Sequence, residues 1–416
     1  MPNKRQTKGM MMRQLGTYAL RGFLAVALVL ALAIGWSSWL GKQRAGWTET
    51  TWQLPAKDMD LGSSLQAELN RETKANPNIP GQLLYVRAPN LGLDQTFASG
   101  PDLRTDDDVR VASNTKTFVS AMALQLVEAG KLQVDGPIGP ALSPAVRTMM
   151  EKNGYQLDTI TLRHLLNHTS GIPDYVSVPA FRILALGPTA YGWSPHWTAE
   201  SEIWFAVTFG RRDAVGGDFN YTDTNYLIAA DMIKQATKSA TIGAAARQML
   251  DWPKLGADET YWEAMEPTPA GTRRVAQYRG AIRDSELDVS FDQYGGGGLV
   301  MSMDDLGRAT RAVVRGEVFA NPVATRILMQ TSGPDGAGEG YALGIEPTKL
   351  NGEVCWGHGG FWGTSAFHCP RLDITVARST GQSNSMQGYR EGFGPLSALI
   401  LAAQAAERDR AKATSD

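Results

Sequence analysis

Residues 111–132 read VASNTKTFVSAMALQLVEAGKL, a polar turn followed by an amphipathic helical pattern. Within this stretch Ser113 and Lys116 stand three positions apart, and at that spacing both side chains lie on one face of a helix. A serine hydroxyl is a weak nucleophile until a neighbouring base takes its proton, and a lysine can be that base only where its surroundings favour the neutral amine. Taken alone, the pair favours a helix that begins with solvated polar residues, so the rest of the chain has to decide between the two interpretations.

The chain has 416 residues and 43% hydrophobic content, enough for a full core in one large or two ordinary domains. Its formal net charge of −2 is unevenly distributed. The residues before position 45 include seven of the 40 basic residues and no acid, so the remainder has 33 basic against 42 acidic residues. Because phosphate binding needs a basic surface, this acidic body argues against nucleic acid as a partner.

An uncharged run at 22–41, GFLAVALVLALAIGWSSWLG, is long enough to cross a bilayer as a helix. Five cations precede it and two follow it, which places residues 1–21 in the cytoplasm and the body of the chain outside. We therefore expect a single-pass signal anchor in the inner (plasma) membrane, with 42–60 as a polar linker. A cleaved signal peptide is the alternative, and it would leave a periplasmic or secreted protein.

The body of the chain, 61–405, lacks repeats and is followed by a polar tail at 406–416. A helical pattern at 63–74 comes first, and the stretch from 113 to about 290 is mostly helical in pattern, with Gly/Pro-rich loops. Strand-like runs bounded by turn residues lie at 81–89, 93–100, 340–347, 353–360, 363–370 and 374–380. This order predicts an α+β fold in which both ends of the chain build one sheet and a helical subdomain is inserted between them.

Two further polar clusters carry possible chemistry. In FNYTDTNYLIAADMI, Tyr221 and Asp223 precede an apolar helical run. Tyr221 could shuttle a proton where a cation lowers its pKa, and the plainer alternative is that Asp223 or Thr222 caps the helix while Tyr221 packs. The second cluster, around His358, is followed by two glycines that would let a ligand approach the strand backbone.

The stretch 355–369, CWGHGGFWGTSAFHC, contains both cysteines of the chain. A hairpin centred near Trp362 would place Cys355 opposite Cys369, at a separation that suits a disulfide. An even cysteine count in an exported protein also favours a bridge, and two buried thiols are the alternative. We expect the bridge to clamp the two strands that carry His358.

Neither a metal nor an organic cofactor is expected. His164 and His168 have a spacing that zinc sites use, but no glutamate follows the first one and no third ligand is evident, so a structural helix end is the better interpretation. The glycine run at 295–298 lacks the Lys-Ser/Thr pair of a phosphate-binding loop, so we expect a tight loop beside the sheet. Ser302 and Asp305 after it indicate a helix start.

Together these motifs resemble those of the penicillin-recognising serine hydrolases. The sequence has S-N-T-K at 113–116, Y-T-D at 221–223 and H-G-G at 358–360, in the order and rough spacing of that family's three motifs. The resemblance is to the branch of class C β-lactamases, D-alanyl-D-alanine carboxypeptidases and D-aminopeptidases, and it covers about 65–405. It implies a β-lactamase/transpeptidase-like fold, with an antiparallel sheet flanked by helices.

The resemblance also implies roles for individual residues. Ser113 would be the acyl-accepting nucleophile and Lys116 its partner base, although the identity of the base is disputed in related enzymes. Tyr221 would be the second general base and acid, protonating the leaving group. His358 would take the place of the family's usual lysine or histidine on the edge strand. Backbone N–H groups of Ser113 and Phe361 would form the oxyanion hole.

Two residues depart from the family pattern. Asp223 stands where the second motif usually ends in asparagine, and an ionised aspartate only accepts hydrogen bonds. It would suit Lys116 or a substrate N–H and would repel an acyl carbonyl. Gly359 stands where many members carry a threonine that helps hold a substrate carboxylate. Gly359 followed by Gly360 resembles D-aminopeptidases and some esterases instead.

We therefore predict a membrane-anchored serine acyl hydrolase of the cell envelope that works through an acyl-enzyme on Ser113. Its expected partner is a small-molecule or peptide substrate: a D-amino-acid peptide, a related amide or a β-lactam. A carboxylesterase with the same residues is one alternative. A penicillin- or peptidoglycan-binding sensor with little turnover is another, of a different class.

Overall fold

The computed structural model describes residues 50–54, 60–186, 195–279, 282–331, 340–383 and 393–413. Its centre is a six-stranded antiparallel sheet of order β2-β1-β11-β10-β9-β8. The strands are β1 (Gln82–Ala88), β2 (Leu93–Ser99), β8 (Glu346–Leu350), β9 (Glu353–Gly360), β10 (Thr364–Cys369) and β11 (Ile374–Ser379). Because β1 and β2 precede the helical middle of the chain and β8–β11 follow it, the predicted α+β sheet built from both ends is confirmed.

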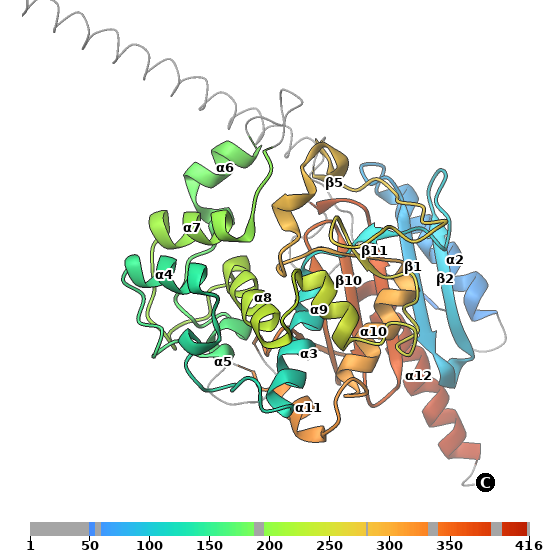
Figure 1. Ribbon diagram of the computed structural model, residues 1–416. Helices are drawn as coiled ribbons and strands as arrows, with labels where there is room; N and C mark the ends of the chain where they lie inside the picture. Colours follow the sequence, from blue (N-terminus) through green and yellow to red (C-terminus); the bar gives the residue numbers. More distant parts are fainter. Residues whose placement is uncertain are drawn as a thin grey trace, which may run out of the picture.

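Helices cover both faces of this sheet, and a further group of helices stands beside it. Figure 1 shows α4, α5, α6 and α7 on one side, the sheet on the other, and α3, α8 and α9 between them. The helices are α2 (Leu61–Ala75), α3 (Thr115–Glu128), α4 (Pro144–Lys152), α5 (Leu162–Leu166), α6 (Pro179–Leu186), α7 (Ala199–Phe209), α8 (Asp223–Thr237), α9 (Ile242–Met249), α10 (Met303–Val314), α11 (Pro322–Leu328) and α12 (Phe393–Ala413). Helix α12 extends into the predicted polar tail at 406–416, so the described part of that tail is helical.

Short strands connect the helical region to the sheet. A second sheet has the order β3-β7-β4, and β5 pairs with β6 in a small hairpin. These strands are β3 (Val109–Arg110), β4 (Tyr261–Trp262), β5 (Tyr278–Arg279), β6 (Ile282–Arg283) and β7 (Leu299–Met301). Strand β3 of the second sheet precedes the turn that begins α3, so its pairing with β7 fixes where that helix starts.

Local sequence explains how α10 begins and packs. The Ser302 side chain accepts a hydrogen bond from the Asp305 N–H, as predicted. Acids occupy the first turn, where their negative charge interacts favourably with the positive end of the helix dipole. Leu306, Ala309 and Val313 recur at helical spacing, and all three are buried in the larger core. Burying a side chain such as Leu306 contributes about 1.5–3 kcal/mol.

One predicted strand differs from the structure. The run 340–347 is strand only from Glu346 onward. Gly344 adopts a φ of 77°, its N–H donates to the Leu166 carbonyl, and a Cβ at this position would overlap Ser120 on α3. The alternating pattern therefore reflects packing against α3 and α5 instead of pairing in the sheet.

The predicted anchor at 22–41 and the segment 1–21 lie outside the described residues, as does most of the linker at 42–60. Among the helices that the structure describes, none combines the length and the apolar character needed to cross a membrane.

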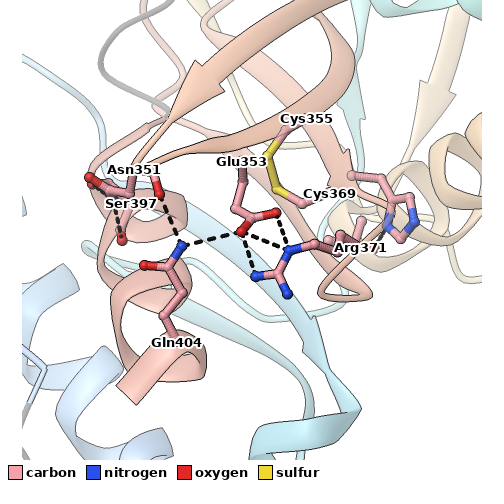
Figure 2. The surroundings of a disulfide bond; sticks show 9 residues. Asn351, Glu353, Cys355, Cys369, Arg371, Ser397 and Gln404 are labelled. Carbon is pink, nitrogen blue, oxygen red and sulfur yellow. Dashed lines mark hydrogen bonds and ion pairs between the residues drawn. A yellow bond between two sulfur atoms is a disulfide. The ribbon is translucent and has the colours of Figure 1, made fainter. Parts of the chain in front are cut away.

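The predicted disulfide between Cys355 and Cys369 is present, with Cα atoms 4.0 Å apart (Figure 2). The pairing of β9 with β10 sets His358 opposite Ala366, which centres the hairpin on Trp362 as expected. Side chains alternate between the faces of a strand. The two cysteines therefore pack in the core beneath α2 and α12, and His358 lies on the opposite face, toward α3.

Replacing both cysteines by serine should lower the free energy of unfolding by about 2–3 kcal/mol, because the bridge closes a short loop in the unfolded chain. Hydrolytic activity should survive, since Gln404 on α12 still bonds Asn351 and Glu353 at the same hairpin (Figure 2). Urea denaturation of the Cys355→Ser/Cys369→Ser variant without reductant measures this. An unchanged midpoint would contradict the expectation.

Asp108 gives stability an unusual pH dependence. It is fully buried, and its carboxylate oxygens have no hydrogen-bond partner among the described residues. Burial and the charges of Glu259 and Asp305 raise its pKa to about 7. The folded protein thus keeps a proton that the unfolded chain releases near pH 4, so this carboxyl lowers stability as the pH rises from about 4 to 7.

Asp108→Asn should therefore raise the free energy of unfolding by about 1–2 kcal/mol at pH 8 and by much less at pH 4. Urea denaturation at both pH values measures the difference. Asp106→Asn, at an exposed side chain paired with Arg104, is the matched control and should show no such dependence. A gain of equal size at both pH values would contradict the assignment.

Candidate active site

Ser113 lies in a 3₁₀ turn directly before α3 and is half-buried. The preceding Ala112 has a φ of 47°, in the left-handed region that residues with a side chain seldom adopt. The turn is held by the Asn114 side chain, which donates to the Val111 carbonyl at 2.8 Å and to Thr364 Oγ1 at 3.1 Å. Backbone strain of this kind collects at functional sites, where the surrounding structure holds it in place.

Lys116, the second residue of α3, is fully buried, and its amine has three oxygen partners. Nζ lies 3.0 Å from Ser113 Oγ, 2.7 Å from the Gly296 carbonyl oxygen and 2.5 Å from Asp223 Oδ1. An ammonium has three donors, so these contacts use all of them. The glycine run at 295–298 is the predicted tight loop, and its contribution to the site, a carbonyl oxygen aimed at the lysine, was not foreseen.

Asp223 is the first residue of α8, and its side chain bonds Lys116 instead of capping the helix. Two more carboxylates surround it. Asp174 Oδ1 accepts the Asp223 N–H at 3.2 Å, and Asp292 lies against Gly297, where a Cβ would touch its carboxylate. Burial and the charge of Asp223 raise the pKa of both Asp174 and Asp292 to about 7. The sequence analysis assigned no role to either residue.

Tyr221 stands between the lysine and a histidine. Lys116 Nζ lies 5.1 Å from the centre of the Tyr221 ring, and the His168 ring lies 4.3 Å from it on ring centres. His168 Nδ1 accepts the Thr222 N–H at 3.1 Å, and burial holds its pKa well below the usual value, so the ring is neutral. His168 therefore supports Tyr221, whereas His164 forms a capping box at the start of α5.

His358 lies on β9, is 1% exposed and uses both ring nitrogens. Nδ1 lies 2.5 Å from the Gly359 carbonyl oxygen, which can only accept, so this nitrogen carries the proton. Nε2 then accepts from the hydroxyl of Tyr341 at 2.8 Å. Burial and the charge of Lys116 lower the pKa of His358 to about 3. The ring is therefore neutral at physiological pH, and Tyr341, which no motif indicated, fixes its tautomer.

Gly360 lets the end of β9 approach the turn that holds Ser113. A Cβ there would overlap the Val111 carbonyl oxygen and Thr364 Oγ1, so no larger residue fits. The chain then reaches Phe361, whose side chain is 37% exposed. The end of β9 therefore packs against the turn that holds Ser113. This packing brings Phe361, whose backbone N–H is the second expected oxyanion donor, to the same turn.

The structure gathers Ser113, Lys116, Tyr221, Asp223 and His358 around one point. Within the described residues, no group of three or more histidines, cysteines or acids could hold a metal ion. A hydroxyl, a buried amine and an acid in contact are the parts of an activated serine nucleophile.

The model of the beta-lactamase family matches residues 86–393, which is more than half of the chain. The chain belongs to the beta-lactamase family. It is accordingly a serine hydrolase of the β-lactamase fold, as the motifs implied.

Proteins of several named activities are similar to it. Esterase EstB of Burkholderia gladioli is 37% identical over 22% of this chain and 22% of its own length. The chain matches only about a third or less of the length of such curated relatives. A D-stereospecific amidohydrolase from Streptomyces sp. is 27% identical with a TM-score of 0.65, over 76% of this chain and 94% of its own. A D-amino acid amidase from Ochrobactrum anthropi, 18% identical with a TM-score of 0.68 over 84% of this chain and all of its own, shares the fold.

Proposed function

We propose that this beta-lactamase family member hydrolyses D-amino-acid amides and peptides through an acyl-enzyme on Ser113. The observation that carries the proposal is the contact of one buried amine, Lys116 Nζ, with both Ser113 Oγ and Asp223 Oδ1. This geometry lets the serine lose its proton within the site, without help from bulk water.

The proton moves along the observed contacts. Lys116 donates to Ser113 in the resting state, so it must first pass a proton to Asp223 before it can accept one. Ser113 Oγ then bonds to the acyl carbon as its proton goes to Lys116, and backbone N–H groups of Ser113 and Phe361 stabilise the oxyanion. The C–N bond breaks as Tyr221 protonates the departing amine. Water releases the acid by the reverse proton transfers.

Three features support D-amino-acid amides as the substrate class. The structurally similar Streptomyces protein is named a D-stereospecific amidohydrolase. Gly359 has no hydroxyl to hold the carboxylate that a penicillin carries, and the neutral His358 adds no positive charge. Asp223 suits a substrate N–H, which an amide provides. Ester hydrolysis by the same residues is the second candidate, favoured by the stretch similar to EstB.

Steady-state hydrolysis by the full-length protein in detergent tests the proposal. The substrates are D-phenylalanine amide, L-phenylalanine amide, a p-nitrophenyl ester and a penicillin, each with the parent and with Ser113→Ala. We expect the D-amide to exceed the L-amide in kcat/KM at least about tenfold, equivalent to about 1.4 kcal/mol. Ester cleavage without amide cleavage would establish the second candidate. A penicillin adduct without turnover of any substrate would establish a sensor instead.

We also propose that residues 22–41 anchor the protein in the inner (plasma) membrane with the catalytic body outside the cytoplasm. The disulfide supports export, since such bonds persist in oxidising compartments. Protease added to intact spheroplasts should digest the body. Digestion only after lysis would contradict this location.

A further inference from the structure

The start of α8 is held by a carboxyl from another part of the chain. The N-cap residue of α8 makes no side-chain capping bond, and the N–H of Asp223 donates to Asp174 Oδ1 at 3.2 Å instead. Thr224 fixes the chain on either side of this carboxyl, because its hydroxyl donates to the Pro173 carbonyl oxygen at 2.9 Å and accepts the Tyr175 N–H at 3.0 Å. Asp174 therefore has a fixed place beside Asp223.

Asp292 approaches Asp223 from the side of the glycine loop. A Cβ at Gly297 would lie 2.5 Å from both carboxylate oxygens of Asp292, and one at Gly296 would lie 3.3 Å from Asp223 Oδ1. The buried hydroxyl of Tyr175 donates at 3.2 Å to the carbonyl oxygen of the residue before Asp292, and burial keeps the pKa of this hydroxyl well above its usual value. A neutral tyrosine thus links the two segments that bring these carboxyls to the site.

Hydrogen bonding does not account for two more carboxyls beside Asp223. An amide or hydroxyl oxygen would accept a backbone N–H as well, and it would avoid the repulsion between ionised neighbours. Both carboxyls are repelled by Asp223 more strongly than they are attracted by Lys116. What a carboxyl adds at these two positions is a negative charge that depends on pH.

Other charged groups face this cluster from neighbouring elements. Arg110 on β3 and Glu263 after β4 act on Asp292 with opposite signs, and they pair with each other at 2.6 Å. Glu202 on α7 is fully buried, its carboxylate oxygens have no partner among the described residues, and burial holds its pKa so far above the usual value that it stays neutral. Asp174 and Asp292 titrate near neutrality, since burial and the neighbouring carboxylate raise the pKa of each to about 7.

We infer that Asp174 and Asp292 are positioning residues that act through the ion pair of the catalytic lysine: as carboxylates they drive its proton onto Asp223. A negative charge that acts more strongly on Asp223 than on Lys116 destabilises the ion pair relative to the neutral pair, in which an N–H bond has broken and an O–H bond has formed. Lys116 can then accept the proton of Ser113. Acylation of Ser113 should therefore switch on as the pH rises through about 7. This inference rests on the proposed function and adds a control over its first proton transfer.

The acylation rate of Ser113 by p-nitrophenyl acetate tests this control, because the ester does not titrate. The burst of p-nitrophenol from the full-length protein in detergent is followed at its isosbestic wavelength between pH 5 and 8. For the parent we expect a rise of at least about tenfold, equivalent to one unit of proton affinity. Asp174→Asn/Asp292→Asn should match the parent within about twofold at pH 5 and lose most of the rise, and each single variant should lose part of it.

These variants should fold. Each amide keeps an acceptor oxygen, and it removes a carboxyl whose raised pKa lowers stability as the pH rises from about 4 to 7. Asp231→Asn is the matched control, since Asp231 is a buried carboxylate of the same helix that accepts the Ser143 N–H at 2.8 Å, about 12 Å along the helix axis from Asp223. It should keep the parental pH profile.

Two results for the double variant would overturn the inference. One is a rise with pH as large as that of the parent, and the other is a rate lowered by the same factor at every pH, which a merely structural role would produce. A parental burst whose rate is independent of pH would overturn this inference alone, because Ser113 would still be acylated. If no burst appears at any pH, Ser113 is not acylated and the proposed function itself fails.

Discussion

Ser113→Ala should lower kcat/KM for any substrate of this protein by at least about 10³-fold, because removal of a nucleophile leaves only the binding and oxyanion contributions. The hydroxyl is half-buried and its described side-chain partner is Lys116, so the fold should persist. The thermal unfolding midpoint of the variant should stay within a few degrees of the parent, equivalent to about 1 kcal/mol.

Ser120→Ala is the matched control for this variant. Ser120 is a fully buried serine of the same helix, 3.3 Å from the Tyr226 hydroxyl and outside the proposed proton path. We expect it to keep hydrolysis within a few-fold while losing about 1 kcal/mol of stability, the worth of a typical hydrogen bond. Hydrolysis by Ser113→Ala at the rate of Ser120→Ala would refute the assigned nucleophile.

Lys116→Met should remove activity and stability together. The lysine is the proposed base for Ser113, so kcat/KM should fall at least about 10³-fold. The same change leaves Asp223 without its ion-pair partner, beside Asp174 and Asp292. Breaking a buried pair by removing one partner costs about 3–5 kcal/mol, so the variant should unfold far below the parent midpoint.

The loss of stability should grow with pH. Burial and Asp223 raise the pKa of Asp174 and Asp292 to about 7, and the charge of Lys116 opposes this rise. Without the lysine, both carboxyls should hold their protons to higher pH. The folded variant then still holds protons above pH 7 that the unfolded chain has released, so its stability keeps falling there, whereas near pH 4 both states are protonated and the penalty is smaller.

The double variant Lys116→Met/Asp223→Asn separates the two roles. Removing the charge of Asp223 should restore most of the lost stability without restoring hydrolysis, and urea denaturation at pH 5 and 8 beside kinetics measures both. A single Lys116→Met variant as stable as the parent at pH 8 would contradict the ion pair. An active double variant would contradict Lys116 as the base.

Features carried by neighbouring residues could be predicted from the sequence. The spacing of Ser113 and Lys116 sets them on one helical face, and the symmetry of Cys355 and Cys369 about Trp362 gives the hairpin register and the disulfide. In both cases the spacing along the chain determines which two side chains meet. The strand-like pattern at 340–347 failed because Gly344 turns the backbone and the run packs on a helix.

Contacts between distant segments could not be predicted in this way. Asp174 and Asp292 reach the site from loops whose local sequence is ordinary, and their proximity to Asp223 depends on the packing of the helical region. Tyr341 meets His358 only because the run before β8 leaves the sheet.

The measurement that tests the central claim most directly is the intact mass of the full-length protein, quenched within milliseconds to seconds of mixing with a D-aminoacyl p-nitrophenyl ester. The account predicts one acyl group per molecule, located by peptide mapping to Ser113, with a matching burst of p-nitrophenol and neither signal from Ser113→Ala. Turnover of the ester with no adduct on Ser113, or the same adduct on Ser113→Ala, would contradict it.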